Sequence, residues 1–226
     1  MVAAVIVAAG SGARMGEGTD KLFLELAGRP VVGHTWARFD GLPEIDEIVL
    51  VVRDGRQGEF IELGAALSVA KPHRIVEGGA ERQDSVWNGL MAVSSGVDIV
   101  AIQDGARPCT DAGLIVRTID AARETGAAVA AGRVTDTIKE VDEDGFVARH
   151  INRELLRAVQ TPQAFQLRVI RHALEAVRDK ERHVSDDTAA CELIGQTVKL
   201  VESSIPNPKV TTASDLPWIE QLLRGH

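Results

Sequence analysis

The sequence predicts an α/β fold, a doubly wound and mostly parallel sheet with a β-hairpin arm protruding from it. Short apolar, β-branched runs alternate with amphipathic helical stretches, the pattern of a parallel sheet covered by helices on both faces. One segment alternates apolar and polar residues on both sides of the turn signal Asp142–Gly145, which indicates a hairpin. With 226 residues, 45% of them hydrophobic, and no Pro/Gly linker, we expect residues 1–226 to form one domain.

Taken in chain order, the predicted elements alternate regularly. The runs expected to form buried strands are Val2–Val7, Ile48–Val52, Ile99–Ile102, Ala127–Ala131 and Thr197–Val201. The stretches expected to form amphipathic helices are Pro30–Phe39, Phe60–Val69, Arg82–Val93, Leu114–Glu124 and Leu167–Val177. A Rossmann-like sheet of this kind binds its ligands outside the carboxyl ends of the strands.

The predicted arm covers about residues 134–153. Its two strands would be Val134–Val141 and Phe146–Ile151, each alternating apolar and polar side chains. Because the arm interrupts the strand–helix alternation like an insertion, we expect it to cover a site or to clasp a partner subunit.

The composition argues against several classes of function. A net charge of −8 is unfavourable for general nucleic-acid binding, which needs a basic face, but leaves room for small anionic substrates. No apolar run approaches the ~18 residues of a membrane span, and no signal-peptide pattern begins the sequence, so we expect a cytoplasmic protein that does not bind membranes. Cys109 and Cys191 match no metal-binding spacing and are expected to be reduced thiols. The histidines show no pattern typical of a hydrolase triad.

A glycine-rich loop, A-A-G-S-G-A-R-M-G-E-G-T-D-K at residues 8–21, follows the first predicted strand. It is not a dinucleotide fingerprint, because three residues rather than two separate Gly12 from Gly16, and it lacks the Gly-Lys-Ser/Thr of a P-loop. Glycines let backbone N–H groups approach phosphate oxygens, while Arg14 and Lys21 add cations that can follow charge developing on a phosphorus. The loop therefore indicates nucleotidyl transfer, with a solvated loop carrying incidental charges as the alternative.

Two motifs follow later predicted strands. G-G-A-E-R-Q-D-S-V at residues 78–86 places Arg82 and Ser85 on one face of the first turn of a helix, where a hydroxyl alone would be structural. Q-D-G-A-R-P at residues 103–108 places Asp104 at the carboxyl end of a central strand, where a carboxylate suits Mg²⁺. A structural ion pair between Asp104 and Arg107 is the alternative.

Two further stretches come later in the chain. S-D-D-T at residues 185–188 is typical of a helix N-cap with acidic residues that complement the helix dipole. The segment P-N-P-K-V-T at residues 206–211 places Lys209 on a late loop.

The loop resembles the signature of sugar-phosphate nucleotidyltransferases. From Val2 to about Leu223 the chain resembles the 2-C-methyl-D-erythritol 4-phosphate cytidylyltransferases of the non-mevalonate isoprenoid pathway, including R-E-L-L-R-A-V-Q-T-P-Q-A-F at residues 153–165. The resemblance implies transfer of CMP from CTP to 2-C-methyl-D-erythritol 4-phosphate, with release of pyrophosphate. It also implies Mg²⁺ or another divalent cation as cofactor and a homodimer formed through the arm. A ribitol 5-phosphate cytidylyltransferase and a catalytically silent nucleotide-binding module are the alternatives.

The resemblance also implies a set of site residues. The catalytic residues would be Arg14 and Lys21. Those binding the nucleotide would be Ala8, Ala9, Gly10, Ser11, Gly12, Gly79, Ala80, Arg82 and Ser85. Those binding the sugar phosphate would be Asp104, Arg107, Thr137, Arg153, Ser185 and Lys209. Asp104 would also ligate the metal, and Arg153 with Thr137 would reach the cleft of the neighbouring subunit.

Overall fold

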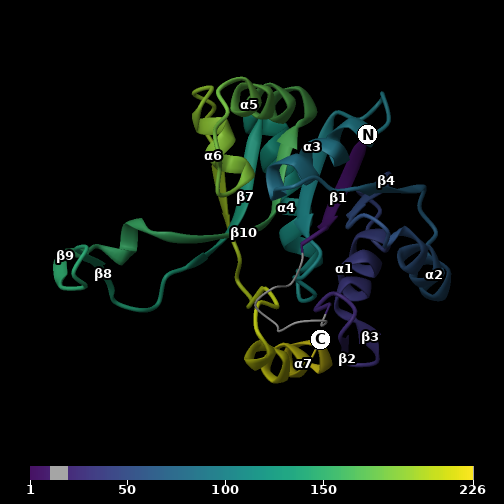
Figure 1. Ribbon diagram of the computed structural model, residues 1–226, viewed down its shortest axis with the longest axis horizontal. Coiled ribbons are helices and arrows are strands. Elements are labelled where there is room, and N and C mark those ends of the chain that lie inside the picture. Colours follow the sequence, from purple (N-terminus) through teal and green to yellow (C-terminus); the bar gives the residue numbers. More distant parts are fainter. Residues whose placement is uncertain (11–19, 226) are drawn as a thin grey trace.

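The computed structural model describes residues 1–10 and 20–225, and its centre is a seven-stranded sheet in the order β11-β7-β10-β6-β1-β4-β5 (Figure 1). The strands are β1 (Val2–Ala8), β4 (Glu47–Val52), β5 (His73–Glu77), β6 (Ile99–Asp104), β7 (Ala127–Arg133), β10 (Arg157–Gln166) and β11 (Lys199–Glu202). Strand β10 pairs antiparallel with β6 and β7, and the other pairs in this sheet are parallel. The predicted mostly parallel α/β sheet is confirmed.

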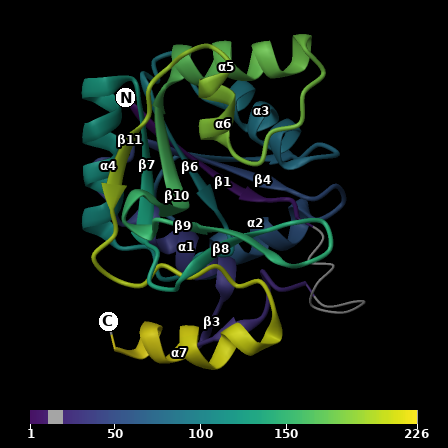
Figure 2. The ribbon, with the colours of Figure 1, turned by 90° about the vertical axis from the view of Figure 1, so that its left-hand side faces the viewer.

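Helices cover both faces of the sheet, because side chains along each strand point alternately to opposite faces. On β1, Ala4 and Ile6 belong to one core cluster, whereas Ala3 and Val5 belong to the other. The helices of the first face are α1 (Val31–Asp40), α2 (Gln57–Leu67) and α4 (Ala112–Thr125). Those of the second face are α3 (Arg82–Ala92), α5 (Leu167–Asp179) and α6 (Asp187–Glu192) (Figure 2). The fold is doubly wound, as predicted.

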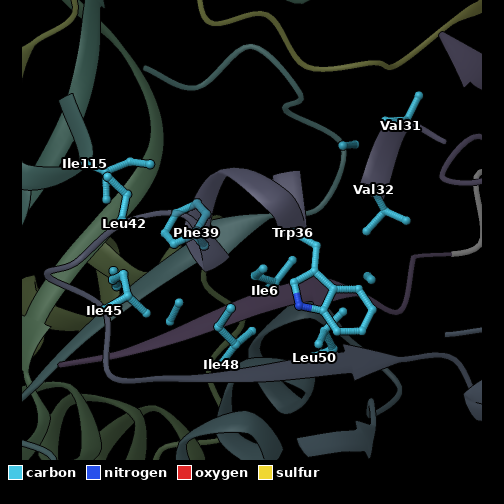
Figure 3. Packing of buried hydrophobic residues seen from close by; sticks show 14 of the residues in the cluster. Ile6, Val31, Val32, Trp36, Phe39, Leu42, Ile45, Ile48, Leu50 and Ile115 are labelled. Carbon is cyan, nitrogen blue, oxygen red and sulfur yellow. The ribbon is translucent and has the colours of Figure 1, made fainter. Parts of the chain in front are cut away.

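Large side chains of α1 fill the core of the first face. Trp36 and Phe39 are fully buried and pack over Ile6, Ile48 and Leu50 of the sheet (Figure 3). A short antiparallel pair, β2 (Glu25–Leu26) and β3 (Arg29–Pro30), leads into α1. This packing anchors the chain directly after the glycine-rich segment.

The predicted arm is a β-hairpin that extends away from the sheet (Figure 1). Its strands are β8 (Ile138–Val141) and β9 (Val147–Ile151), and a turn ending at Gly145, with a φ of 86°, joins them. A 3-10 helix, Arg153–Leu155, leads from the arm into β10. In chain order the arm therefore connects β7 to β10, two strands that pair with each other in the main sheet.

The last helix, α7 (Leu216–Arg224), follows a 3-10 turn at Ala213–Asp215 and lies near β2 and β3 (Figure 1). Within residues 1–10 and 20–225, no helix combines the length and apolar character needed to cross a membrane.

Close packing of α3 on the sheet requires glycine at residue 89. A Cβ atom there would lie 2.5 Å from Cγ1 of Val5 and 2.8 Å from Cγ2 of Val51. Since overpacking a core costs roughly 1–3 kcal/mol, we expect Gly89→Ala to lower the free energy of unfolding by an amount in this range. Gly58→Ala is the matched control in α2, because a Cβ atom there meets nothing within 4 Å. Helix propensity alone predicts that the free energy of unfolding of that control rises by up to about 1 kcal/mol. Denaturant unfolding measures both, and equal effects would contradict the packing argument.

Both cysteines are free and buried. Burial raises the pKa of the Cys109 thiol to about 11 and that of Cys191 to about 12. The thiolate is the reactive form, so we expect neither residue to react readily with a disulfide reagent in the folded protein at pH 8. In 6 M guanidinium, about 2 thiols per chain should react at once, because the sequence holds 2 cysteines. Rapid reaction of the folded protein would contradict this prediction.

Candidate active site

A cavity of about 570 Å³ opens beside the carboxyl ends of β1 and β6. This is the edge at which parallel α/β sheets bind ligands. The cavity brings together most of the residues predicted from the sequence. Those that line it are Ala8, Ala9, Gly10, Lys21, Gly79, Ala80, Arg82, Ser85, Asp104 and Lys209.

The other predicted residues lie elsewhere. Arg107 lies beside the cavity, in contact with Asp104. Thr137 and Arg153 lie at the base of the arm, and Ser185 is exposed before α6, so these three side chains do not line the cavity of their own chain. The remaining predicted residues, Ser11, Gly12 and Arg14, lie outside the described residues.

Three cations surround the carboxylate of Asp104 at the end of β6. Nζ of Lys209 lies 2.8 Å from Oδ2, Nε of Arg107 lies 3.6 Å from Oδ2, and Nε of Arg82 lies 3.6 Å from Oδ1. Burial disfavours the charged carboxylate, but Lys209, Arg82 and Arg107 outweigh this effect and hold the pKa of Asp104 below its usual value. The carboxylate is therefore ionised at neutral pH, and the surplus of cations around it suits a phosphorylated ligand.

A buried asparagine, Asn207, accepts a hydrogen bond from one of these cations. Nη1 of Arg107 donates to the carbonyl oxygen of Asn207 at 2.6 Å, and Lys209 follows two residues later. The amide of Asn207 donates to the carbonyl oxygen of Thr161 at 2.8 Å. The hydroxyl of Thr161 in turn accepts the backbone N–H of Asp104 at 3.1 Å. The late loop and the end of β6 are thus joined through β10.

The segment before α3 is packed tightly against the end of β1. A Cβ atom on Gly78 would lie 2.4 Å from Cβ of Ala9, and one on Gly79 would lie 2.3 Å from Cβ of Asp84. The backbone N–H of Gly79 donates to the Ser85 hydroxyl at 3.1 Å, which donates to the carbonyl oxygen of Glu81 at 3.1 Å. Ser85 therefore fixes the turn that forms one wall of the cavity.

Lys21 and Arg53 also line the cavity. Nζ of Lys21 donates to the carbonyl oxygen of Val210 at 2.9 Å, and Nη2 of Arg53 donates to the carbonyl oxygen of Gly10 at 2.8 Å. Arg53 was not among the predicted site residues. Its position directly after β4, at the same sheet edge as Asp104, is the sequence signal that could have identified it.

Comparison with known proteins identifies the family. The family model described as IspD, 2-C-methyl-D-erythritol 4-phosphate cytidylyltransferase, matches residues 2–225. The chain belongs to this family. A cytidylyltransferase of this name from Pelotomaculum thermopropionicum is 43% identical over 225 residues, covering 99% of this chain and 94% of the relative. One from Geobacillus thermodenitrificans is 43% identical, covering 97% of this chain and 96% of the relative.

Solved cytidylyltransferase structures share the fold. The 4-diphosphocytidyl-2C-methyl-D-erythritol synthase from Anaerococcus prevotii has a TM-score of 0.88 at 32% identity, covering 99% of this chain and 96% of that chain. The 2-C-methyl-D-erythritol 4-phosphate cytidylyltransferase from Thermus thermophilus has a TM-score of 0.79 at 32% identity, covering 99% and 100% respectively. The predicted family membership and enzyme class are confirmed.

Proposed function

We propose that this chain transfers the cytidylyl group of CTP to 2-C-methyl-D-erythritol 4-phosphate, giving 4-diphosphocytidyl-2-C-methyl-D-erythritol and pyrophosphate. The observation that carries the proposal is the cluster of Arg82, Arg107 and Lys209 around Asp104 at the sheet edge where this fold binds ligands. Family membership supplies the identity of the two substrates. We propose that residues 1–226 act as one cytidylyltransferase domain.

The reaction requires cations that stabilise negative charge, and it does not require a general base. A phosphate monoester is largely dianionic at neutral pH, because its second pKa is about 6. One of its oxygens attacks the α-phosphorus of CTP, the new P–O bond forms, and the bond to the bridging oxygen breaks, so that the electron pair leaves with pyrophosphate. The barrier comes from bringing two anions together, and positioned cations lower it.

The cavity suggests a division of roles. Lys21, which lines the cavity, would stabilise charge on the α-phosphate and the departing pyrophosphate, together with Arg14, which lies outside the described residues. Lys209 of the late loop, and Arg107, which donates to the carbonyl oxygen of Asn207, would bind the phosphate of the acceptor. The nucleotide would lie against the backbone of Ala9, Gly10 and the turn at Gly79.

The residues present fit a divalent cation that substrate phosphates also ligate. Among the described residues, no three His, Cys, Asp or Glu side chains are grouped to hold a metal by themselves. Magnesium, however, is commonly bound by one or two carboxylates together with substrate phosphates. Asp104, ionised and on the cavity wall, would supply such a ligand. When bound, the cation would neutralise triphosphate charge.

We propose a homodimer in which each arm completes the cavity of the partner subunit. Several apolar side chains of the arm and its base are exposed, including Phe146 at 72% and Leu155 at 82%. Exposed apolar side chains that gather on a protruding hairpin are typical of an interaction surface. This arrangement gives Thr137 and Arg153, which do not line their own cavity, a position at the neighbouring one. A cytoplasmic location is part of the proposal and accords with two free cysteines.

Arg153→Ala is expected to raise the KM for the sugar phosphate by at least about 10-fold and to leave the KM for CTP nearly unchanged, since Arg153 would contact only the acceptor phosphate. Steady-state pyrophosphate release, with each substrate varied in turn, measures both constants. Arg149→Ala is the matched control, because Arg149 lies on the same arm, is 69% exposed and pairs with Glu140. Equal increases in both KM values for the Arg153 variant would contradict the assignment.

The proposed function is tested by incubating the enzyme with CTP and Mg²⁺ and measuring pyrophosphate release. Release with 2-C-methyl-D-erythritol 4-phosphate and not with ribitol 5-phosphate is the expected result. Preference for ribitol 5-phosphate would establish the alternative acceptor. Binding of CTP without release from either acceptor would establish a silent nucleotide-binding module.

A further inference from the structure

A buried carboxylate lies behind the cavity wall at the beginning of α6. The side chain of Asp187 is 1% exposed, and its Oδ2 lies 2.9 Å from Nη2 of Arg82. Neither carboxylate oxygen accepts a hydrogen bond from another described residue. Arg82 is therefore the cation that compensates this buried charge.

The same guanidinium also faces the active-site carboxylate. Nε of Arg82 lies 3.6 Å from Oδ1 of Asp104, while Nη2 is held by Asp187. Arg82 thus bridges two carboxylates from β6 and α6, although its own backbone belongs to α3. Because a guanidinium is planar and rigid, contact at Nη2 fixes the direction of its Nε.

Helix capping does not explain Asp187, because its neighbour performs that task. Oδ1 of Asp186 accepts the backbone N–H of Ala189 at 2.9 Å, and Oδ2 accepts the amide of Gln163 at 3.1 Å. The backbone N–H of Asp187 donates to Oε1 of Gln163 at 3.2 Å, which fixes the beginning of α6. Burying a carboxylate costs free energy, and α6 does not need this one as a cap. We therefore look for another role of Asp187.

We propose that Asp187 is a positioning residue for cytidylyl transfer, which holds Arg82 on the cavity wall and keeps its guanidinium from closing to hydrogen-bond distance of Asp104. Without Asp187, Arg82 would be free to close on Asp104 and occupy the oxygens that face the cavity. With Asp187 in place, Asp104 keeps an oxygen for the ligand, and Arg82 stays as a fixed positive charge. The inference rests on the proposed function.

The first test compares Asp187→Asn with Asp186→Asn. Both changes remove one carboxylate at the beginning of α6, and asparagine at residue 186 still caps the helix. We expect Asp187→Asn to lower kcat/KM by about 10- to 100-fold, the usual effect of losing a residue that orients a functional group, and Asp186→Asn to change it less than about 3-fold. A wild-type kcat/KM for Asp187→Asn would overturn the proposal.

The second test asks whether Asp187 acts through Arg82. It also decides the proposal if the single variant Asp187→Asn fails to fold. Arg82→Gln and the double variant Arg82→Gln/Asp187→Asn are compared, since the double variant leaves no unpaired charge from this pair. Equal kcat/KM values for these two would support the proposal, because Asp187 would then have no effect on activity once Arg82 is removed. A further 10-fold loss in the double variant would overturn it. Wild-type enzyme that releases no pyrophosphate would contradict the proposed function instead.

Discussion

Replacing Lys21 by alanine is expected to lower kcat by on the order of 10²–10³-fold, the loss that follows removal of one positioned donor from a charge-stabilising site. Lys21 lines the cavity, and its Nζ donates to the carbonyl oxygen of Val210, one residue after Lys209. The amine is thus held at the cavity wall beside the late loop, where it could stabilise charge on a bound triphosphate. Steady-state pyrophosphate release at saturating substrates measures the effect.

Loss of the hydrogen bond from Lys21 to the carbonyl oxygen of Val210 should lower the free energy of unfolding by about 1 kcal/mol. Thermal unfolding separates this small effect from the loss of activity. Lys180→Ala is the control, because Lys180 is exposed at the end of α5, away from the cavity lining. An alanine variant at residue 21 that turns over at the wild-type rate would contradict the catalytic assignment.

Replacing Asp104 by asparagine is expected to lower kcat/KM by on the order of 10²–10³-fold as well, for the opposite electrostatic reason. Lys209, Arg82 and Arg107 would lose the negative charge that now orders them. The three cations would repel one another, and the proposed metal ligand would be lost. Pyrophosphate release, measured over a range of Mg²⁺ concentrations, gives the size of the effect.

Stability should also fall in the Asp104 variant, because the side chain of Arg107 is only 12% exposed and its charge would be left without its carboxylate. Asp120→Asn removes a carboxylate from an exposed pair with Arg123 on α4 and is the control. It should change stability by no more than about 1 kcal/mol and leave kcat/KM unchanged. Equal losses of activity in the two variants would show that Asp104 has no special role.

The sheet was predictable where β-branched runs are continuous. Runs such as Val2–Val7 and Ile48–Val52 lie in strands buried on both faces, so composition alone identifies them. Strand β10 was not predicted, because Pro162 interrupts it and proline argues against a central strand. The structure accommodates the proline where the pairing of β10 with β7 shifts register, between Val159 and Gln163.

The site was predictable where its residues follow strands directly. Asp104 ends β6 and the turn at Gly79 follows β5, so each could be recognised from the predicted strand beside it in the sequence. Asp187 was predictable only as an acidic residue that complements a helix dipole, because its partner Arg82 lies 105 residues earlier in the chain. Asn207 carried no signal either, since its hydrogen bonds join segments that only the folded chain brings together.

The position of the arm in the chain determines how it can be removed or replaced by protein engineering. Arg133 and Arg157, at the two ends of the insertion, are already directly opposite each other in the β7–β10 ladder. A two-residue turn in place of residues 134–156 would therefore close an ordinary hairpin without disturbing the strands around it. The arm can therefore be exchanged as a unit without changing the main sheet, but in the proposed dimer each exchange would also replace Thr137 and Arg153 at the partner's cavity.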